Sequence, residues 1–515
     1  MTTKQSAGAA GSGDPKQPRT THHAGHRTST VDRALASVPE AFPETMTVHD
    51  LQEEMTAGRL TSVELTRRCL ERIDRLNPVL RAVISVNPRA LDEARASDRR
   101  RASGETLGPL DGVPVLPKDS IDVAGLATTV GSEVLRHALP TSDARLVTRL
   151  RRGGAVIIGK ANLSEWCNYR TSSGIAGWSA VGGQTRNPYV LDRTPNGSSS
   201  GSAVAPAAGM VPLAIGTDTS GSIIAPAAAN GVVGFRPSLG RVSGIGLFPI
   251  SPDQDTAGPI ARHVADAAAV FEVIAETCAP IRLDAEPRLG TRIGVWRGIR
   301  FGGSLPDVDR VFGAAIAKLR DLGVTTVEVE LPDPDTSALL PYEFKEAVNA
   351  YLALRGGEPR DLAELIALHR GEPAERERVR ELGLTRFEAA QAAESAHTPR
   401  WYREERHRIV EETRRSIDGV FAEHRLDAVI APSNGPAWKI LGPYDYPWVY
   451  SFGPAAVAGY PVITVPAGHA YGALPLGVSL IGRGGDDERL LGLANVFEQA
   501  TQARTSPRYL TTLPE

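Results

Sequence analysis

The sequence has little of several features that mark specialised classes of protein. Its three cysteines, Cys69, Cys167 and Cys278, lie far apart and form no CxxC pair. They therefore suggest neither a disulfide framework nor a zinc site, and they favour a reducing compartment. No apolar run reaches the roughly 18 residues of a membrane span, and the polar N-terminus lacks the apolar core of a signal peptide. We expect a cytoplasmic protein with no membrane partner.

The sequence also has little excess of charge of either sign, with 57 Lys and Arg residues against 60 Asp and Glu residues. The net charge is -3, which gives no broad electrostatic reason to expect nucleic acid as a partner. A hydrophobic content of 41% and a charged content of 23% are typical of a globular protein. The 515 residues are enough for one large domain or for several ordinary ones.

Large apolar residues are rare in the first 41 positions, so residues 1–41 are predicted to be a disordered tail. His22, His23 and His26 within it could bind a metal, but no acidic residue or cysteine lies near enough to assist. A solvated tail is the favoured interpretation. The folded domain is predicted to cover residues 42–515.

Helical and strand-like patterns alternate through most of that domain. A capping box at Thr61 predicts a helix that Pro78 ends, and a β-branched strand follows at 82–86. A second buried strand is predicted at 155–159 and the start of a helix at 163–170. This alternation indicates an α/β fold with a large, mostly parallel or mixed β-sheet.

Residues 341–423 differ from the rest, because Glu, Arg, Ala and Leu dominate them. Helices are predicted there at 342–354, 362–369, 385–395 and 400–421. We interpret the region as a charged helical cover on the sheet, and a separate partner-binding domain is the alternative.

Two serine clusters are candidates for nucleophilic chemistry. The first, at 197–201, matches GxSxG with Ser199 as nucleophile and His469 as the most available base. A nucleophile elbow requires a strand just before it, whereas 189–196 has the composition of a loop. The second cluster, at 216–224, follows an apolar strand and precedes a predicted helix. Backbone N–H groups of Thr219 to Ser222 could converge there on an oxyanion.

Nucleotide binding is disfavoured, because neither serine cluster has the P-loop or the dinucleotide-binding pattern. A lysine, Lys118, ends an apolar and proline-marked segment at 108–117. Most lysines are solvated surface charges, but a lysine at the end of a buried segment is the kind that can lose its proton.

From about Thr47 to the C-terminus, the sequence resembles the amidase signature family of serine hydrolases, and within it the peptide amidases. The resemblance rests on long motifs in order: GPLDGVPVLPKDSID, GKANLSEW, GGQTRNP, GSSSGSAVA, GTDTSGSIIAPAAANGVVGFRP and DTAGP. It implies an α/β fold of one large domain with a central mixed β-sheet covered by helices on both sides. It also implies a catalytic triad of Lys118, Ser198 and Ser222, with a cis peptide bond at Ser198. Ser222 would be the nucleophile, Ser198 the proton relay and Lys118 the general base, with no metal or cofactor required.

The sequence departs from the usual family pattern at three places. NGSSSG replaces GGSSGG, Ser220–Gly221 replaces the GG before the nucleophile, and Ile224 replaces a frequent arginine. Ser220 changes the lining of the oxyanion turn formed by Thr219, Ser220, Gly221 and Ser222. Cys167 aligns with a wall of the family's pocket, and the loop segments 434–438 and 444–448 could form another wall.

The predicted activity is hydrolysis of C-terminal amides of peptides or amino-acid derivatives, by a monomer or homodimer whose only partner is its small-molecule or peptide amide substrate. A broad aryl or alkyl amidase is one alternative. Another is the ammonia-producing subunit of a tRNA-dependent amidotransferase, which would need protein partners and glutamine. A non-catalytic binding protein is disfavoured by the intact triad.

Overall fold

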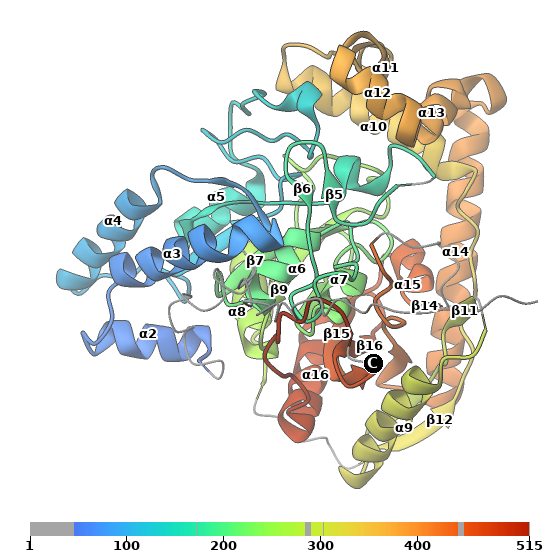
Figure 1. The fold of residues 1–515 in the computed structure, drawn as a ribbon. Coiled ribbons are helices and arrows are strands. Elements are labelled where there is room, and N and C mark those ends of the chain that lie inside the picture. The colour runs from blue at the N-terminus through green and yellow to red at the C-terminus, as the bar shows by residue number, and fades with distance from the viewer. Residues whose placement is uncertain (1–45, 173, 284–289, 302, 441–447, 514–515) are drawn as a thin grey trace, which may run out of the picture.

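A mixed ten-stranded sheet runs through the centre of the molecule (Figure 1). The computed structural model describes residues 46–172, 174–283, 290–301, 303–440 and 448–513. In spatial order the strands are β12 (Thr325–Glu328), β10 (Arg292–Val295), β13 (Ala428–Pro432), β16 (Leu474–Ile481), β15 (Val462–Ala470), β8 (Val233–Arg236), β9 (Thr256–Ala261), β7 (Leu213–Asp218), β2 (Pro114–Pro117) and β3 (Val156–Ile157). Three two-stranded sheets pair β1 (Val83–Val86) with β4 (Gly159–Ala161), β5 (Trp178–Ser179) with β6 (Gly183–Gln184), and β11 (Ile299–Phe301) with β14 (Trp448–Tyr450).

Helices bury both faces of the central sheet, as the family resemblance implies. Successive strand side chains point to opposite faces. In β13, Ala428 and Ile430 join one apolar cluster, whereas Val429 and Ala431 join another. The helices outside the 341–423 region are α2 (Val48–Thr56), α3 (Ser62–Leu80), α4 (Ala90–Ala102), α5 (Arg145–Arg152), α6 (Ser200–Ala207), α7 (Ile224–Ala229), α8 (Val264–Ile274), α9 (Pro306–Asp321), α15 (Gly453–Ala458) and α16 (Asp487–Thr501).

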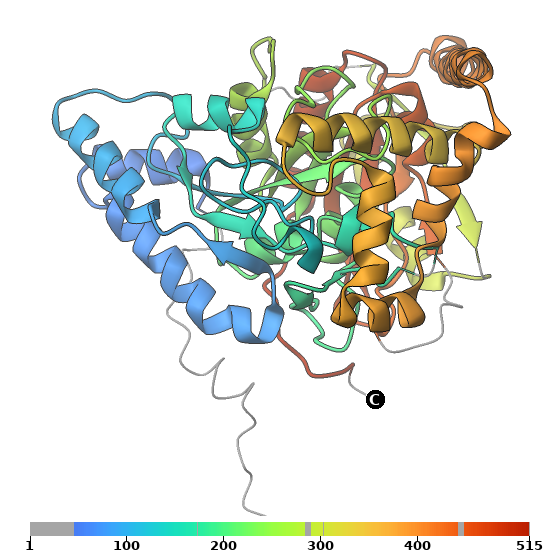
Figure 2. The ribbon, with the colours of Figure 1, turned by 90° about the horizontal axis from the view of Figure 1, so that it is seen from above.

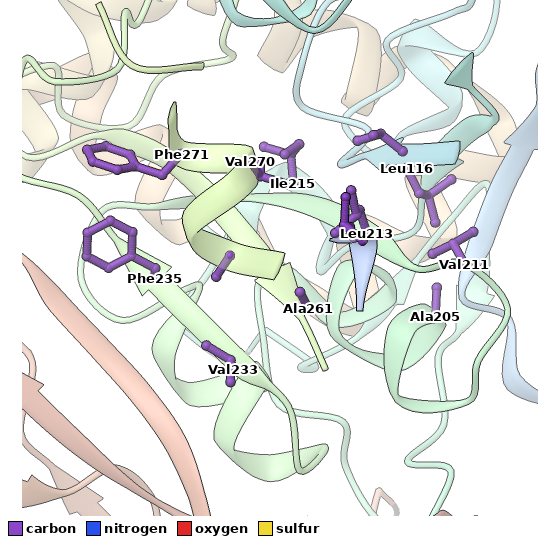
Figure 3. Close-up of a cluster of buried hydrophobic side chains, with 14 of the residues drawn as sticks. Leu116, Ala205, Val211, Leu213, Ile215, Val233, Phe235, Ala261, Val270 and Phe271 are labelled. Carbon is purple, nitrogen blue, oxygen red and sulfur yellow. The ribbon is translucent and has the colours of Figure 1, made fainter. Parts of the chain in front are cut away.

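Figure 3 shows the part of the larger apolar cluster that lies between the sheet and α8. Ile215 of β7 and Phe235 of β8 are fully buried in it, and the ring of Phe235 meets that of Phe271 edge-on at 5.1 Å between centroids. Burying a side chain of this size stabilises the fold by about 1.5–3 kcal/mol. The strands that lead to the serine and lysine motifs are thereby held in a rigid core.

The 341–423 region forms a helical cover, which comprises α10 (Leu339–Arg355), α11 (Leu362–Gly371), α12 (Pro373–Leu382), α13 (Thr385–Ala396) and α14 (Pro399–His424). Figures 1 and 2 show it on the side of the molecule away from α3 and α4. Helix α10 contacts the loop that follows Lys118: the Tyr351 hydroxyl donates to Asp122 at 2.9 Å, and Arg355 donates to the carbonyl of Thr128 at 2.9 Å. The cover therefore braces the chain next to the lysine motif.

Two local predictions were wrong. Pro78 does not stop α3, which continues to Leu80. Leu76 and Leu80 are both fully buried, so packing of this helical face outweighs the hydrogen bond that the proline lacks. The predicted helix at 163–170 is only a short 3-10 turn at Glu165–Asn168, with left-handed backbone at Trp166 and Cys167. Trp166 is fully buried, so tertiary packing overrides helical propensity there.

Several elements were also missed, including α2, β8, β9, α12, β16 and α16. The predicted tail at 1–41, with its three histidines, lies outside the described residues. Within the described ranges, no helix is both long enough and apolar enough to cross a membrane.

Candidate active site

Lys118 lies directly after β2, and its side chain is fully buried. Its backbone N–H extends the strand pairing by donating to the Ile215 carbonyl at 3.0 Å. Its Nζ lies 2.8 Å from the Ser198 hydroxyl, 2.8 Å from the Thr217 hydroxyl and 3.4 Å from the Thr217 carbonyl. The lysine predicted from its motif is therefore surrounded by oxygen atoms at the end of a buried strand.

The surroundings of Lys118 favour its neutral form. Burial lowers the pKa of the Lys118 amine, and this effect outweighs the opposing interactions with the Cys167 thiol and the carboxylates of Asp218 and Asp255. Desolvation penalises a charged ammonium that is removed from water. The neutral amine, which can accept a proton, is therefore present at a lower pH than in an exposed lysine.

Ser198 reaches Lys118 from the first serine cluster. The Gly197–Ser198 peptide bond is cis. The Ser198 carbonyl accepts a hydrogen bond from the N–H of Ser164 at 3.0 Å, and a Cβ on Gly197 would lie 2.3 Å from the Ser164 hydroxyl. Only glycine therefore fits before Ser198 at this close approach.

The alternative nucleophile, Ser199, uses its hydroxyl to hold the backbone of β7. It is fully buried, and its hydroxyl donates to the Thr217 carbonyl at 3.0 Å and accepts from the Thr217 N–H at 3.2 Å. The ring of His469, its candidate base, instead forms a hydrogen bond of 3.0 Å with Thr505. This geometry disfavours a GxSxG hydrolase.

Ser222 lies in the turn between β7 and α7, and the two serine clusters meet there: the N–H of Ser199 donates to the Ser222 carbonyl at 3.1 Å. The Ser222 residue is partly exposed, unlike Ser198 and Lys118. Among the described residues its hydroxyl has no hydrogen-bond partner. It is accessible to a ligand, as a nucleophile must be.

Asp218, the last residue of β7, shapes this turn. Its two carboxylate oxygens accept hydrogen bonds from the N–H groups of Gly221 at 2.8 Å and Ile223 at 2.6 Å. The Gly221 amide, expected among the oxyanion donors, is therefore already bonded. In the described part of the chain, the amides of Thr219, Ser220 and Ser222 have no protein acceptor. These are the N–H groups that remain for an oxyanion.

Two residues to which the sequence analysis gave no role, Arg236 and Asp255, stabilise the turn between β7 and α7. The fully buried Arg236 donates to Asp218 Oδ1 at 2.9 Å, which gives that carboxylate a buried ion pair. The Thr219 hydroxyl donates to Asp255 at 2.5 Å, and burial raises the pKa of Asp255 to about 6. Arg236 and Asp255 both lie in quoted motifs, but the motifs do not reveal which groups they contact.

The structure describes some of the residues that were predicted to form pocket walls, namely Cys167, 434–438 and Trp448. The Cys167 thiol is buried and interacts with Lys118, so it lies beside the lysine. Asn434 is also buried, and it accepts a hydrogen bond from the N–H of Gly477 in β16 at 3.1 Å, which anchors the start of 434–438 to the sheet. Residues 441–447 lie outside the described residues. The Ser220 hydroxyl lies 2.8 Å from the hydroxyl of Tyr450, a residue not singled out from the sequence.

In the ranges that the structure describes, no group of three or more His, Cys, Asp or Glu side chains is arranged to hold a metal ion. The groups that the structure brings together at this site are the Lys118 amine, serine and threonine hydroxyls, the Cys167 thiol and backbone N–H donors.

Comparison with known proteins identifies the family to which the chain belongs. The family model described as Amidase matches residues 64–491. The peptide amidase of Stenotrophomonas maltophilia has a solved structure with 42% identity, covering 90% of this chain and 99% of that one, at a TM-score of 0.81.

Curated relatives include a probable amidase of Arabidopsis thaliana, 38% identical over 490 residues, covering 90% of this chain and 91% of its own. A glutamyl-tRNA(Gln) amidotransferase subunit from Symbiobacterium thermophilum is 36% identical over 487 residues, covering 88% of this chain and 96% of its own. With the family model matching most of its length, this chain belongs to the amidase signature family and is an amide-hydrolysing enzyme.

Proposed function

We propose that the enzyme hydrolyses terminal carboxamides of peptides or amino-acid derivatives and releases ammonia. The observation that carries this proposal is the fully buried Lys118 amine, 2.8 Å from the Ser198 hydroxyl and next to the turn that presents Ser222. In the proposed reaction Ser222 attacks the amide carbonyl and its proton passes through Ser198 to Lys118. Lys118 returns a proton to the leaving ammonia, and water then hydrolyses the acyl-enzyme.

The base function depends on burial of Lys118. A lysine with an ordinary pKa near 10.4 is neutral in only about one molecule in 2,500 at pH 7, which places the active form about 4.6 kcal/mol uphill. Every unit by which burial lowers the pKa recovers about 1.4 kcal/mol of that difference. Because the shift is downward, the position of Lys118 supports its assignment as general base.

The turn before α7 is proposed to stabilise the negative charge that forms during the reaction. The tetrahedral intermediate carries a negative oxygen, and preorganised N–H donors are the usual way to stabilise it. The amides of Thr219, Ser220 and Ser222, which have no acceptor among the described residues, are the proposed donors. Asp218 takes the Gly221 and Ile223 amides and so fixes the turn in one conformation.

The substrate class rests on similarity. At 42% identity, the comparison includes the peptide amidase of Stenotrophomonas maltophilia and a peptide amidase solved with the competitive inhibitor chymostatin. We carry over a preference for peptide amides, and we keep Cys167 as a proposed wall beside the base. The enzyme is proposed to act as a monomer or homodimer without a partner protein or ATP.

The two alternative functions differ from the proposed one in the substrate that each would prefer. A broad aryl or alkyl amidase would prefer aromatic amides, and an amidotransferase subunit would use glutamine together with partner proteins. Purified enzyme should release ammonia from a peptide amide alone. A clear preference for free glutamine, or activity only with added partners, would contradict the proposal.

The triad is tested by single substitutions. Ser222→Ala, Ser198→Ala and Lys118→Ala should each lose most of the ammonia release, while circular dichroism shows a folded protein. Ser199→Ala is the matched comparison, because it removes a neighbouring buried hydroxyl with a structural position. Full activity in Ser222→Ala, with loss in Ser199→Ala, would assign the chemistry to the GxSxG serine instead.

A further inference from the structure

A short aromatic strand lies beside the nucleophile turn. β14 pairs with β11 as an antiparallel ribbon, in which Trp448 lies opposite Phe301 and Tyr450 opposite Ile299. Side chains alternate along a strand, so Trp448 and Tyr450 share one face and Val449 takes the other. Val449 is buried in a separate apolar cluster. The face with Trp448 and Tyr450 is the one that reaches the nucleophile turn.

Tyr450 is fixed against that turn. Its hydroxyl lies 2.8 Å from the Ser220 hydroxyl, two residues before Ser222. Its ring meets the Phe452 ring at 4.7 Å between centroids and packs on Gly453, where a Cβ would lie 2.1 Å from the phenol oxygen. The Phe452 ring in turn lies under Gly221, where a Cβ would lie 2.0 Å from a ring carbon. Two aromatic residues of one segment thus contact two successive residues of the turn.

Trp448 continues this aromatic row away from the turn. Its ring lies 6.1 Å from that of Tyr450 and edge-on to it, and 40% of the residue is exposed. Two residues along a strand span about 7 Å, which is also the repeat of same-facing side chains in an extended peptide. A peptide that extended from Ser222 along this strand would place successive same-facing side chains opposite Tyr450 and then Trp448.

We propose that Tyr450 and Trp448 form an aromatic wall that binds apolar or aromatic side chains on the acyl part of the substrate. This inference rests on the proposed function. When ammonia is the leaving group, every side chain of the substrate belongs to the acyl part, so a wall beside the nucleophile can only select acyl side chains. Tyr450 faces the residue that carries the amide, and Trp448 faces the residue before it.

The wall would distinguish peptide amides from free glutamine. Apolar and aromatic side chains gain from contact with fixed rings, both by losing water and by edge-to-face packing. Free glutamine has no side chain of that kind, and its ammonium and carboxylate groups gain nothing from an apolar surface. Selection by this wall thus acts through the substrate's side chains rather than through its amide.

Two matched dipeptide amides test the wall: N-acetyl-Phe-Ala-NH2 and N-acetyl-Ala-Ala-NH2. Trp448→Ala should lower kcat/KM for the phenylalanine substrate by roughly threefold to tenfold, the size of one aromatic contact, and change the alanine substrate less than twofold. Tyr471→Ala is the control, because Tyr471 is also an exposed aromatic residue, at 64%, but lies in the β15–β16 turn. Trp448→Phe should retain most of the preference.

The outcomes separate the wall from the proposed function. If the wild type hydrolyses both amides but Trp448→Ala leaves their kcat/KM ratio unchanged, or lowers both equally, the wall is refuted and the amidase proposal stands. If the wild type releases ammonia from neither amide but does so from glutamine or an aryl amide, the proposed function fails and the wall fails with it. A thermal melt of Trp448→Ala checks that the variant is folded.

Discussion

Removing one hydroxyl beside Lys118 should shift the pH dependence of the enzyme. Lys118 Nζ contacts the Thr217 hydroxyl at 2.8 Å, and Thr217→Val deletes that acceptor while keeping a branched side chain of similar size. A charged ammonium has three N–H donors to satisfy, whereas a neutral amine has two and accepts from Ser198. The substitution therefore penalises the charged form more than the neutral form.

The size of the shift follows from hydrogen-bond energies. A hydrogen bond to a charged group contributes about 1.5–3 kcal/mol and a neutral one about 0.5–1.5 kcal/mol. Their difference is about 1–1.5 kcal/mol, which corresponds to a fall of roughly one unit in the pKa of Lys118. Burial already lowers that pKa, so Thr217→Val moves it further in the same direction.

The assay is the pH profile of kcat/KM for a peptide amide, which reports groups of the free enzyme. Activity rises with pH as Lys118 deprotonates, and the midpoint of this rise should fall by about one pH unit in Thr217→Val. Ser120→Ala is the control, because its hydroxyl lies 3.3 Å from that of Thr217 and is not a contact of Lys118. An unmoved or higher midpoint would refute Lys118 as the base that limits activity at low pH.

Three further outcomes are expected. Gly221→Ala should abolish ammonia release, because φ is +95° and the new Cβ would clash with an aromatic ring, whereas Gly313→Ala meets open space and should be fully active. Asp218→Asn should lower the urea-unfolding free energy by roughly 3–5 kcal/mol, because it leaves Arg236 buried without its counter-charge; a loss under about 1 kcal/mol would contradict this. Burial raises the pKa of Glu498 to about 8, so ionisation opposes folding and stability falls as pH rises toward that value. Glu498→Gln should therefore melt higher than wild type near pH 9 and similarly near pH 5, and an equal melting temperature at both would count against it.

Much of the fold follows from the sequence because local pattern and tertiary structure agree. Strand β13 and helix α9 have apolar periodicities that match the faces they bury. The triad residues came from motif resemblance, and the structure brings Lys118 within hydrogen-bonding distance of Ser198. Their catalytic roles await the substitutions described above.

The remaining features depend on contacts between distant parts of the chain. Nothing near Tyr450 in the sequence indicates that its hydroxyl meets Ser220, 230 residues away. The left-handed turn at Trp166 likewise follows from its neighbours in space, because its ring packs against Phe248 and Phe387 at 5.3 and 5.5 Å. Local propensity contains no information about such partners.

The position of the site follows from one parallel strand pair. β2 and β7 run side by side with Pro117 opposite Ile215, so their carboxyl ends meet at the same edge of the sheet. Lys118 follows β2 directly, and the turn that presents Ser222 follows β7, so residues far apart in the chain converge. Ligand sites in open α/β sheets lie at such carboxyl ends. A slip of one residue in this register would move Lys118 by about 3.3 Å and turn its side chain to the opposite face, away from Ser198. The buried apolar residues of β2 and β7 therefore position the candidate site as well as stabilise the fold, because their packing fixes the register that brings Lys118 to Ser198.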